Sequence, residues 1–412
     1  MSRPAVLGAV EYEAETANTG WAEDVDTFSL RLNVQNPVDF SGIVHSQIPN
    51  TATTQYMGEW PEPIVGTQSG EFTTDLFLPG HGTTTAGAIS AREYETLLAN
   101  VIGTSTSTGT GTTATGGTAG TPTTTSASGF AAGGVVFVGA SGDGRASGQA
   151  GVVGSHGSNN LVLLNELPAA PANTDVIASS NVVHPYEAVG STSVRSYRFR
   201  LLTANLQISC HGCWPKSIRF SGLGSGEKPM VSITWGVSRW KFVSATFPST
   251  VTPETYTPAP CAGGSLHWQT VGTATRNAYK VRNFEFNVDL GIIPQDATGG
   301  FSQYQTTVGA VRGQHAVTGS FVLNEETVTT TPAWASTWWT APGTNKLLVY
   351  TLSGAATGKR MAFVCPAVKP DGPAPMTMND NGANALRVAF RACTGATTTS
   401  ALTQSSYRIA FG

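Results

Sequence analysis

One stretch of the chain alternates polar and apolar residues without a break, from Asn283 to Leu290. This period of two is typical of a β-strand that has one buried face and one face in water. An irregular polar loop is predicted at 291–313, and a second strand is expected at 317–323. Most hairpin loops have about two to five residues, so a loop of this length indicates a functional or disordered segment.

The same arrangement recurs near the start of the chain. Residues 27–35 alternate in the same way, a polar stretch follows at 36–66, and residues 68–78 return to a strand pattern. We interpret the recurrence as an internal duplication of a strand, a long loop and a second strand. Two unrelated sandwich strands are the alternative, because alternation is common in β proteins.

A helix is expected after the second strand of each half. Residues 90–103 have Ser90 and Glu93 at the spacing of a capping box, and Gly103 follows as a stop. An apolar stripe along this segment predicts packing against a sheet; it comprises Tyr94, Leu97, Leu98 and Val101. A shorter helical segment, 332–339, takes the corresponding place in the second half.

Residues 104–134 consist almost entirely of Thr, Gly, Ser and Ala. Such low complexity indicates a flexible insertion, which continues to residue 190 with some strand character. We therefore expect two duplicated β-sandwich or half-barrel domains, each with a flanking helix. The predicted divisions are an N-terminal arm (1–24), a first domain (25–245) that contains the insertion (104–190), a linker (246–278) and a second domain (279–412).

Further strands are expected in both halves, joined by glycine-rich or Asn-Gly turns. In the first half they are 194–202, 206–208, 217–220 and 231–235, and in the second half 346–352, 361–365, 386–391 and 406–411.

Charged residues make up 12% of the chain, against about 25% in a typical soluble protein. The formal net charge of −3 gives no basic footprint for tight nucleic-acid binding. Low charge of this kind suits a protein that buries much of its surface against copies of itself.

Five cysteines in so long a chain argue against a disulfide framework. The first residues lack the apolar core of a signal peptide, and no run reaches the roughly 18 apolar residues of a membrane span. We expect a soluble protein that is made in a cytoplasm.

Candidate chemistry is sparse. Cys210-His211-Gly212-Cys213 has the spacing of half a zinc site, but no second pair exists, so a turn at a strand end is favoured. Residues 222–228 lack the Gly-Lys-Ser/Thr of a phosphate loop and predict a hairpin turn. No catalytic constellation, cofactor site or metal site is predicted. Tryptophans such as Trp235, Trp334 and Trp338 are expected to pack in cores.

Several segments resemble a known family. Residues 284–288, the loop, and then 313–321 resemble the second half of the tail tube proteins (major tail proteins) of long-tailed bacteriophages. Residues 212–222 are similar to that family's strand pair before a turn, and 93–103 to its helix. The resemblance spans about 20–245 and 279–411, and the insertion has no counterpart in it.

The resemblance implies a structural virion protein rather than an enzyme. Its subunits form rings that stack into a tube through which DNA passes, so the partners are copies of the chain, other tail proteins and, transiently, DNA. The location would be the phage tail, assembled in the host cytoplasm without a membrane. If each chain carries two domains, three chains complete a ring with pseudo-six-fold symmetry.

Two residue sets follow from this implied assembly. Polar residues of the alternating strands would line the channel and keep DNA mobile by weak repulsion, with Arg31 as the only base: Arg31, Asn33, Glu71, Asp75, Glu285, Asn287 and Asp289. Residues of the two long loops would stack one ring on the next: His45, Gln55, Tyr56, Glu59, Gln303 and Tyr304. A secreted or surface sugar-binding β-sandwich is the alternative, and an enzyme ranks third.

Overall fold

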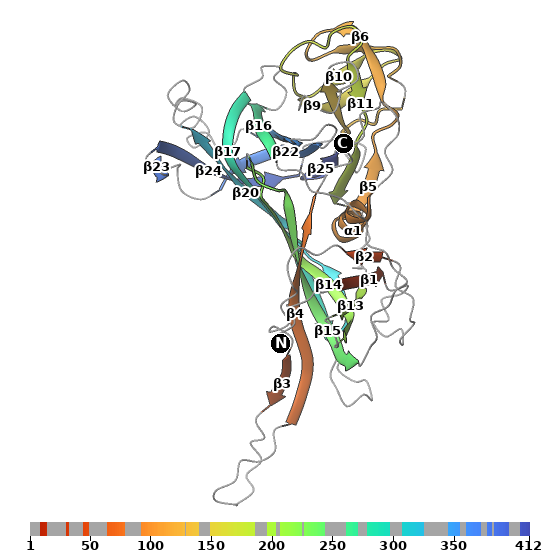
Figure 1. Cartoon of the computed structure of the whole chain (residues 1–412), viewed down its shortest axis with the longest axis vertical. Helices are drawn as coiled ribbons and strands as arrows, with labels where there is room; N and C mark the ends of the chain where they lie inside the picture. Colours follow the sequence, from red (N-terminus) through yellow and green to blue (C-terminus); the bar gives the residue numbers. More distant parts are fainter. Residues whose placement is uncertain are drawn as a thin grey trace, which may run out of the picture.

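The computed structural model describes residues 9–14, 30–32, 44–48, 64–78, 92–127, 129–139, 149–185, 196–202, 207–224, 226–243, 261–270, 278–296, 307–324, 345–354, 360–371, 377–380, 383–394 and 404–412. These residues form 25 strands and one helix, which confirms the predicted mainly β class. Figure 1 shows an elongated molecule, with long strands along its length and a lobe of shorter strands at one end.

Six strands from the second half of the chain pair in a closed circuit, which we call the barrel. In order of pairing they are β17 (Ala278–Asp289), β20 (Ala316–Asn324), β24 (Ala383–Cys393), β22 (Arg360–Pro370), β21 (Lys346–Gly354) and β16 (Cys261–Thr270), which pairs back with β17. Every pairing is antiparallel. The interior is aromatic: Phe284 stacks on Tyr350 with ring centroids 4.1 Å apart, and Phe286 lies 5.3 Å from Phe363. The predicted alternation at 283–290 therefore places Phe284 and Phe286 in a closed core.

A second group of strands, the arm, continues the same sheet. Its strands are β3 (Val44–Ile48), β4 (Ile64–Phe77), β15 (Met230–Val243), β14 (Gln207–Ser221), β13 (Tyr197–Leu202), β1 (Ala9–Ala14) and β2 (Leu30–Leu32). The first half of β14 pairs with β13, and its second half pairs with β17 of the barrel. Trp235 is fully buried in the arm, 4.6 Å from the ring of Phe199, so its predicted core role is confirmed.

A turn at a strand end was predicted around Cys210 and Cys213, and this prediction is wrong. Residues 207–221 form the single strand β14, and both cysteines are free thiols buried in the core. Gly212 lies between them with a φ of +58°, and the register between β13 and β14 shifts at this point. A glycine with positive φ here produces a bulge rather than a chain reversal. The hairpin turn predicted at 222–228 is confirmed, because Ser221 pairs with Met230.

Helix α1 (Glu93–Ile102) packs its apolar stripe into the core. Tyr94 is buried, and its ring lies 5.4 Å from that of Phe411, edge to face. Gly103 is the C-cap, as predicted. The predicted capping box is wrong, because the helix begins at Glu93 with Arg92 as its N-cap and no side-chain cap. Ser90 and the second helix predicted at 332–339 lie outside the described residues.

The segment predicted to be a flexible insertion is instead folded. Its stem is β5 (Gly103–Ser107), which pairs with β12 (Asn181–Pro185); β12 also pairs with β25 (Arg408–Phe411), which in turn pairs with β22. Beyond the stem, the described residues between 108 and 180 form what we call the insert. Its sheet has the order β10 (Leu161–Leu163), β9 (Gln149–His156), β8 (Val135–Gly139), β11 (Val176–Ala178), β6 (Thr112–Gly117) and β7 (Pro122–Thr124).

Two features explain why the Thr/Gly sequence is ordered. Larger residues from later in the segment supply a core, including Phe130, Val136 and Leu161, all at most 1% exposed. Threonines also satisfy buried backbone groups: the Thr108 hydroxyl donates to the Val135 carbonyl over 3.2 Å. β-branched residues suit the half-buried surface of a strand, so low complexity did not imply flexibility here.

The insert packs against one outer face of the barrel. β8 and β9 lie over β21, β22 and β25, and the residues at this contact are Val135, Phe137, Ala150 and Val152 from the insert and Leu347, Val349, Ala362, Val364 and Ala410 from the barrel side. Two buried arginines reach the insert from β22 and β25. The Arg408 guanidinium donates to the Gly133 carbonyl over 3.0 Å, and Arg360 lies 5.7 Å from the centre of the Phe137 ring.

Two further hairpins complete the description. The loop predicted to be irregular at 291–313 contains β18 (Ile292–Asp296) paired with β19 (Thr307–Arg312), so it is a strand pair near its base. β23 (Thr377–Asp380) pairs with β24 across a two-residue connection, as the Asn381-Gly382 dipeptide predicts.

The predicted domain divisions need two corrections. Residues 261–270, assigned to a linker, form the barrel strand β16. In the first half, β2 pairs with β1, while β4 pairs with β15 and β3, so the described residues contain no β2–β4 hairpin to match the β17–β20 hairpin. Alternation predicts which side chains share a face, but it does not say which strand is the partner.

Candidate functional site: a polar sheet face

One face of the sheet that joins the arm to the barrel is polar across six strands. The strands run in the order β4, β15, β14, β17, β20 and β24, and each pairs antiparallel with the next. We call this surface the polar face. A line of residues crosses it at matched register positions and continues onto β22; this central row is Asp75, Ser232, Arg219, Asn287, Thr318, Arg391 and Lys369.

Alternation along each strand creates this face. In β17 the residues next to the core, Phe284, Phe286 and Val288, are at most 1% exposed, whereas Glu285, Asn287 and Asp289 point the other way. Because the pleat repeats every two residues, an in-register neighbour shares the same side. The six strands therefore add their polar residues to one continuous surface.

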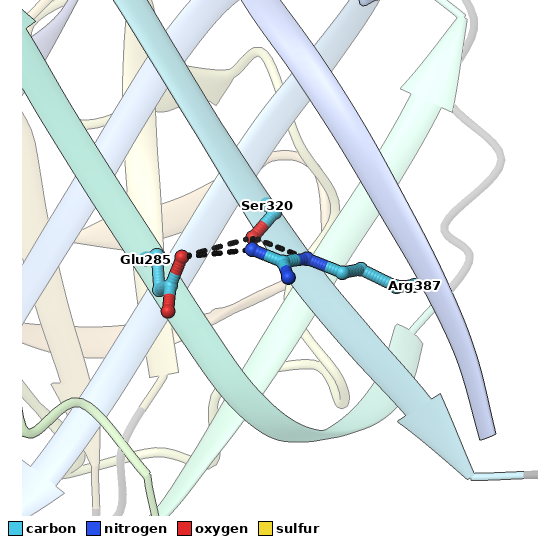
Figure 2. A network of polar contacts seen from close by, with 3 residues as sticks. All are labelled: Glu285, Ser320 and Arg387. Carbon is cyan, nitrogen blue, oxygen red and sulfur yellow. Dashed lines mark hydrogen bonds and ion pairs between the residues drawn. The ribbon is translucent and has the colours of Figure 1, made fainter. Parts of the chain in front are cut away.

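A network of hydrogen bonds and one ion pair joins β17, β20 and β24 in the barrel part of the polar face. Arg387 on β24 donates from Nη2 to Oε2 of Glu285 on β17 over 3.1 Å, passing over β20 (Figure 2). Ser320 on β20 lies between them and accepts from Nε and Nη2 of Arg387 over 3.3 and 3.2 Å. The Ser320 hydroxyl donates to Glu285 over 3.4 Å. The Glu285 carboxylate is thus bound to a cation.

The other acids of the face also have partners. Glu71 forms an ion pair with Lys216, and Asp371 lies 3.5 Å from Arg391. Asp75 accepts from the Ser232 hydroxyl over 2.6 Å, and Asp289 accepts from the Gly291 backbone over 3.0 Å. Together with Glu285 these make five acids, and five bases lie on the same face: Lys216, Arg219, Lys369, Arg387 and Arg391.

Most of the predicted channel residues come together. Glu71, Asp75, Glu285, Asn287 and Asp289 all lie on the polar face. Arg31 does not join them. Its strand, β2, pairs with β1, which pairs with β13, and β13 in turn pairs with β14 of the polar face. Asn33 lies outside the described residues.

The prediction that Arg31 is the only base is wrong. Arg219, Arg387 and Arg391 share the face with the acids. Their own strands do alternate in the sequence, at 217–221 and 386–391, and that signal could have included them. The register that places them beside Glu285 and Asn287 could not be read from the sequence.

Of the residues predicted to stack one ring on the next, the structure describes only His45. His45 lies in β3, where it pairs with Gln68 of β4. Gln55, Tyr56, Glu59, Gln303 and Tyr304 lie outside the described residues. Their role stays a prediction.

Other chemistry is limited in the part of the chain that the structure describes. Its residues contain no cluster of three or more His, Cys, Asp or Glu side chains placed to hold a metal. Burial raises the pKa of the Cys365 thiol far above its ordinary value, so this cysteine stays protonated and unreactive. Among the same residues, no helix has the length and hydrophobicity needed to cross a membrane.

The chain matches no protein-family model, and no curated protein matches it.

Proposed function

We propose that the chain is a structural subunit of the tail tube of a long-tailed bacteriophage. Copies of it form rings, and the stacked rings enclose a channel for DNA. The polar face lines that channel, and two tube domains per chain make three chains sufficient for a ring with pseudo-six-fold symmetry. The long segments at 36–66 and 291–312 contact the next ring.

This proposal rests on the polar face and on the unpaired strand edges at the two ends of its sheet. No described strand pairs with the second edge of β4 over 70–77, or with the second edge of β23. Unpaired edges at both ends of one sheet favour pairing with another chain. Joining β4 of one copy to β23 of the next would continue the sheet into a ring with its polar residues on one side.

The composition of the face suits a conduit. Acids and bases are balanced, and three of the acids are held in ion pairs. A balanced wall exerts little long-range force on a polyanion, because screening removes what remains beyond about 10 Å at 0.1 M salt. This revises the expected acidic repulsion: Glu285 is bound to Arg387 and is not a free negative charge.

A proline on the open edge tests the assembly. The Leu78 backbone N–H donates to the Pro229 carbonyl next to β15, and alternate residues point opposite ways, so the Thr73 N–H points to the open edge. The side-chain contact of Thr73 with Thr234, 3.4 Å between hydroxyls, fits the closer, non-hydrogen-bonded type of pair. Thr73→Pro should therefore leave the fold intact, because proline is tolerated on that side of an edge strand, and should block pairing with a neighbour.

Negative-stain electron microscopy of the purified full chain gives the readout. We expect rings or tubes from the natural chain, dispersed subunits from Thr73→Pro, and tubes from the matched control Thr73→Val. A circular dichroism spectrum of Thr73→Pro equal to that of the natural chain confirms its fold. Absence of any ring or tube from the natural chain would refute the proposed function, and normal tubes from the folded proline variant would refute the β4 edge.

A further inference from the structure

The bases of the polar face are not equivalent. Lys216, Arg387 and Arg391 each form an ion pair with an acid of the polar face. Arg219 is exposed, and no ion pair of Arg219 is found among the described residues. It therefore offers a full positive charge to solvent from the middle of the polar face, whereas Lys369, which is also exposed and has no ion pair among the described residues, lies at the end of the central row.

The neighbours of Arg219 are neutral hydrogen-bonding groups. Ser232 of β15 and Asn287 of β17 flank it in register, and Thr318 of β20 follows Asn287 in the central row. Strands lie about 4.8 Å apart, so these groups lie within roughly two strand spacings of the guanidinium-bearing residue. All of them belong to rigid strands rather than loops.

This set of groups suits the phosphate backbone of a nucleic acid. Guanidinium groups bind phosphate oxygens through two parallel N–H donors, and Ser, Thr and Asn side chains are common additional donors to phosphate. Base edges would need grooves or aromatic stacking to be read, and the central row contains no aromatic residue. A contact here would be independent of sequence.

We propose that Arg219 is the residue through which each chain contacts DNA phosphates, with Asn287 as a flanking donor. The proposal rests on the proposed function, because it takes the polar face to line the channel. One unneutralised base for each chain at this point gives weak, rapidly exchanging contacts. Such contacts guide DNA along the wall without retaining it.

Salt-dependent binding of a short fluorescein-labelled DNA duplex to the full chain tests the proposal. The logarithm of the binding constant falls with the logarithm of salt concentration by about 0.9 for each phosphate contact in duplex DNA. Arg219→Gln should weaken binding at low salt and reduce that slope by about 0.9 for each chain engaged. Arg219→Lys should restore the slope, because it keeps the charge.

Lys216→Gln is the matched control, since it removes the same charge from the same face but from an ion pair with Glu71. Its slope should change less than that of Arg219→Gln. Equal slopes for the two variants, or no binding of DNA by the natural chain, would overturn the role of Arg219. Electron microscopy of the same samples separates this result from the proposed function: tubes without DNA binding refute only the inference, whereas absence of tubes from the natural chain refutes the function.

Discussion

The barrel has two outer faces that differ in chemistry and in what covers them. On β17, β20 and β24 the outward residues include Glu285, Ser320 and Arg387, and no described segment packs over them. On β21 and β22 the outward residues include Val349 and Val364, which are fully buried beneath the insert. One set of strands thus presents an open polar face and a covered apolar face.

The difference explains why the insert packs on this side of the barrel. The outer side of β21 and β22 is too apolar to be left in water, since each buried valine contributes roughly 1.5–3 kcal/mol. The insert covers that side within the same chain. The polar face needs no cover, and it is therefore the surface available for partners.

The largest expected effect comes from weakening the cover. Phe137→Ala should lower the free energy of unfolding by about 3–5 kcal/mol, because Phe137 is fully buried between the insert and the barrel. Thr318→Ala on the polar face is the control and should change it by no more than about 0.5 kcal/mol. Urea unfolding measures both. Similar values for the two variants would contradict the distinction between the faces.

A smaller effect should appear on acidification, through His184 in the stem beneath the insert. Its Nε2 lies 3.1 Å from the Thr106 hydroxyl and its Nδ1 lies 3.1 Å from the Pro185 carbonyl. Burial lowers the pKa of His184 from its ordinary value of 6.5; the hydrogen bond to Pro185 acts the other way, and the positive charge of Arg408 lowers it further.

The sign of the effect follows from these directions. The unfolded chain binds the His184 proton more readily than the folded chain, so stability is full above about pH 6.5 and falls as the pH drops below that value. His184→Gln removes this titration. The stability difference between the natural chain and the variant, measured by urea unfolding from pH 7.5 to about 5, should therefore shrink with acid. A difference that stays constant across this range would exclude His184 as the cause.

The sequence predicted some of these features and not others, for physical reasons. Alternation at 283–290 and the stripe of α1 gave the buried faces correctly, because burial is encoded in local period. The folded insert was missed because most of its core, including Val136 and Leu161, comes from residues that follow the Thr/Gly run, and only a few residues of the run, such as Phe130, contribute to it. The strand β16 was also missed: most of its length pairs with β21, which lies much later in the chain.

The same limit applies to the candidate site. Alternation placed Glu285 and Asp289 on a polar surface, which was sufficient to suggest an acidic wall. Whether an acid acts as a free charge depends on its cross-strand neighbour, and Arg387 is 102 residues away from Glu285 in the chain. Register, which no single strand encodes, decides the electrostatics of the face.

The smallest expected effect concerns the ion pair between Arg387 and Glu285, which the strand register brings together. The side chains of Arg387 and Glu285 are 49% and 30% exposed, so solvent screens their attraction. A double-mutant cycle with Glu285→Gln, Arg387→Gln and the double variant should give a coupling of about 0.2–1 kcal/mol in the free energy of unfolding, decreasing as salt is added. The glutamines keep the side-chain shape beside Ser320, so the cycle isolates charge. A coupling above about 3 kcal/mol that is insensitive to salt is the behaviour of a buried pair. That result would mean that the polar face is covered in the isolated chain, and the contrast between the two faces of the barrel would fail.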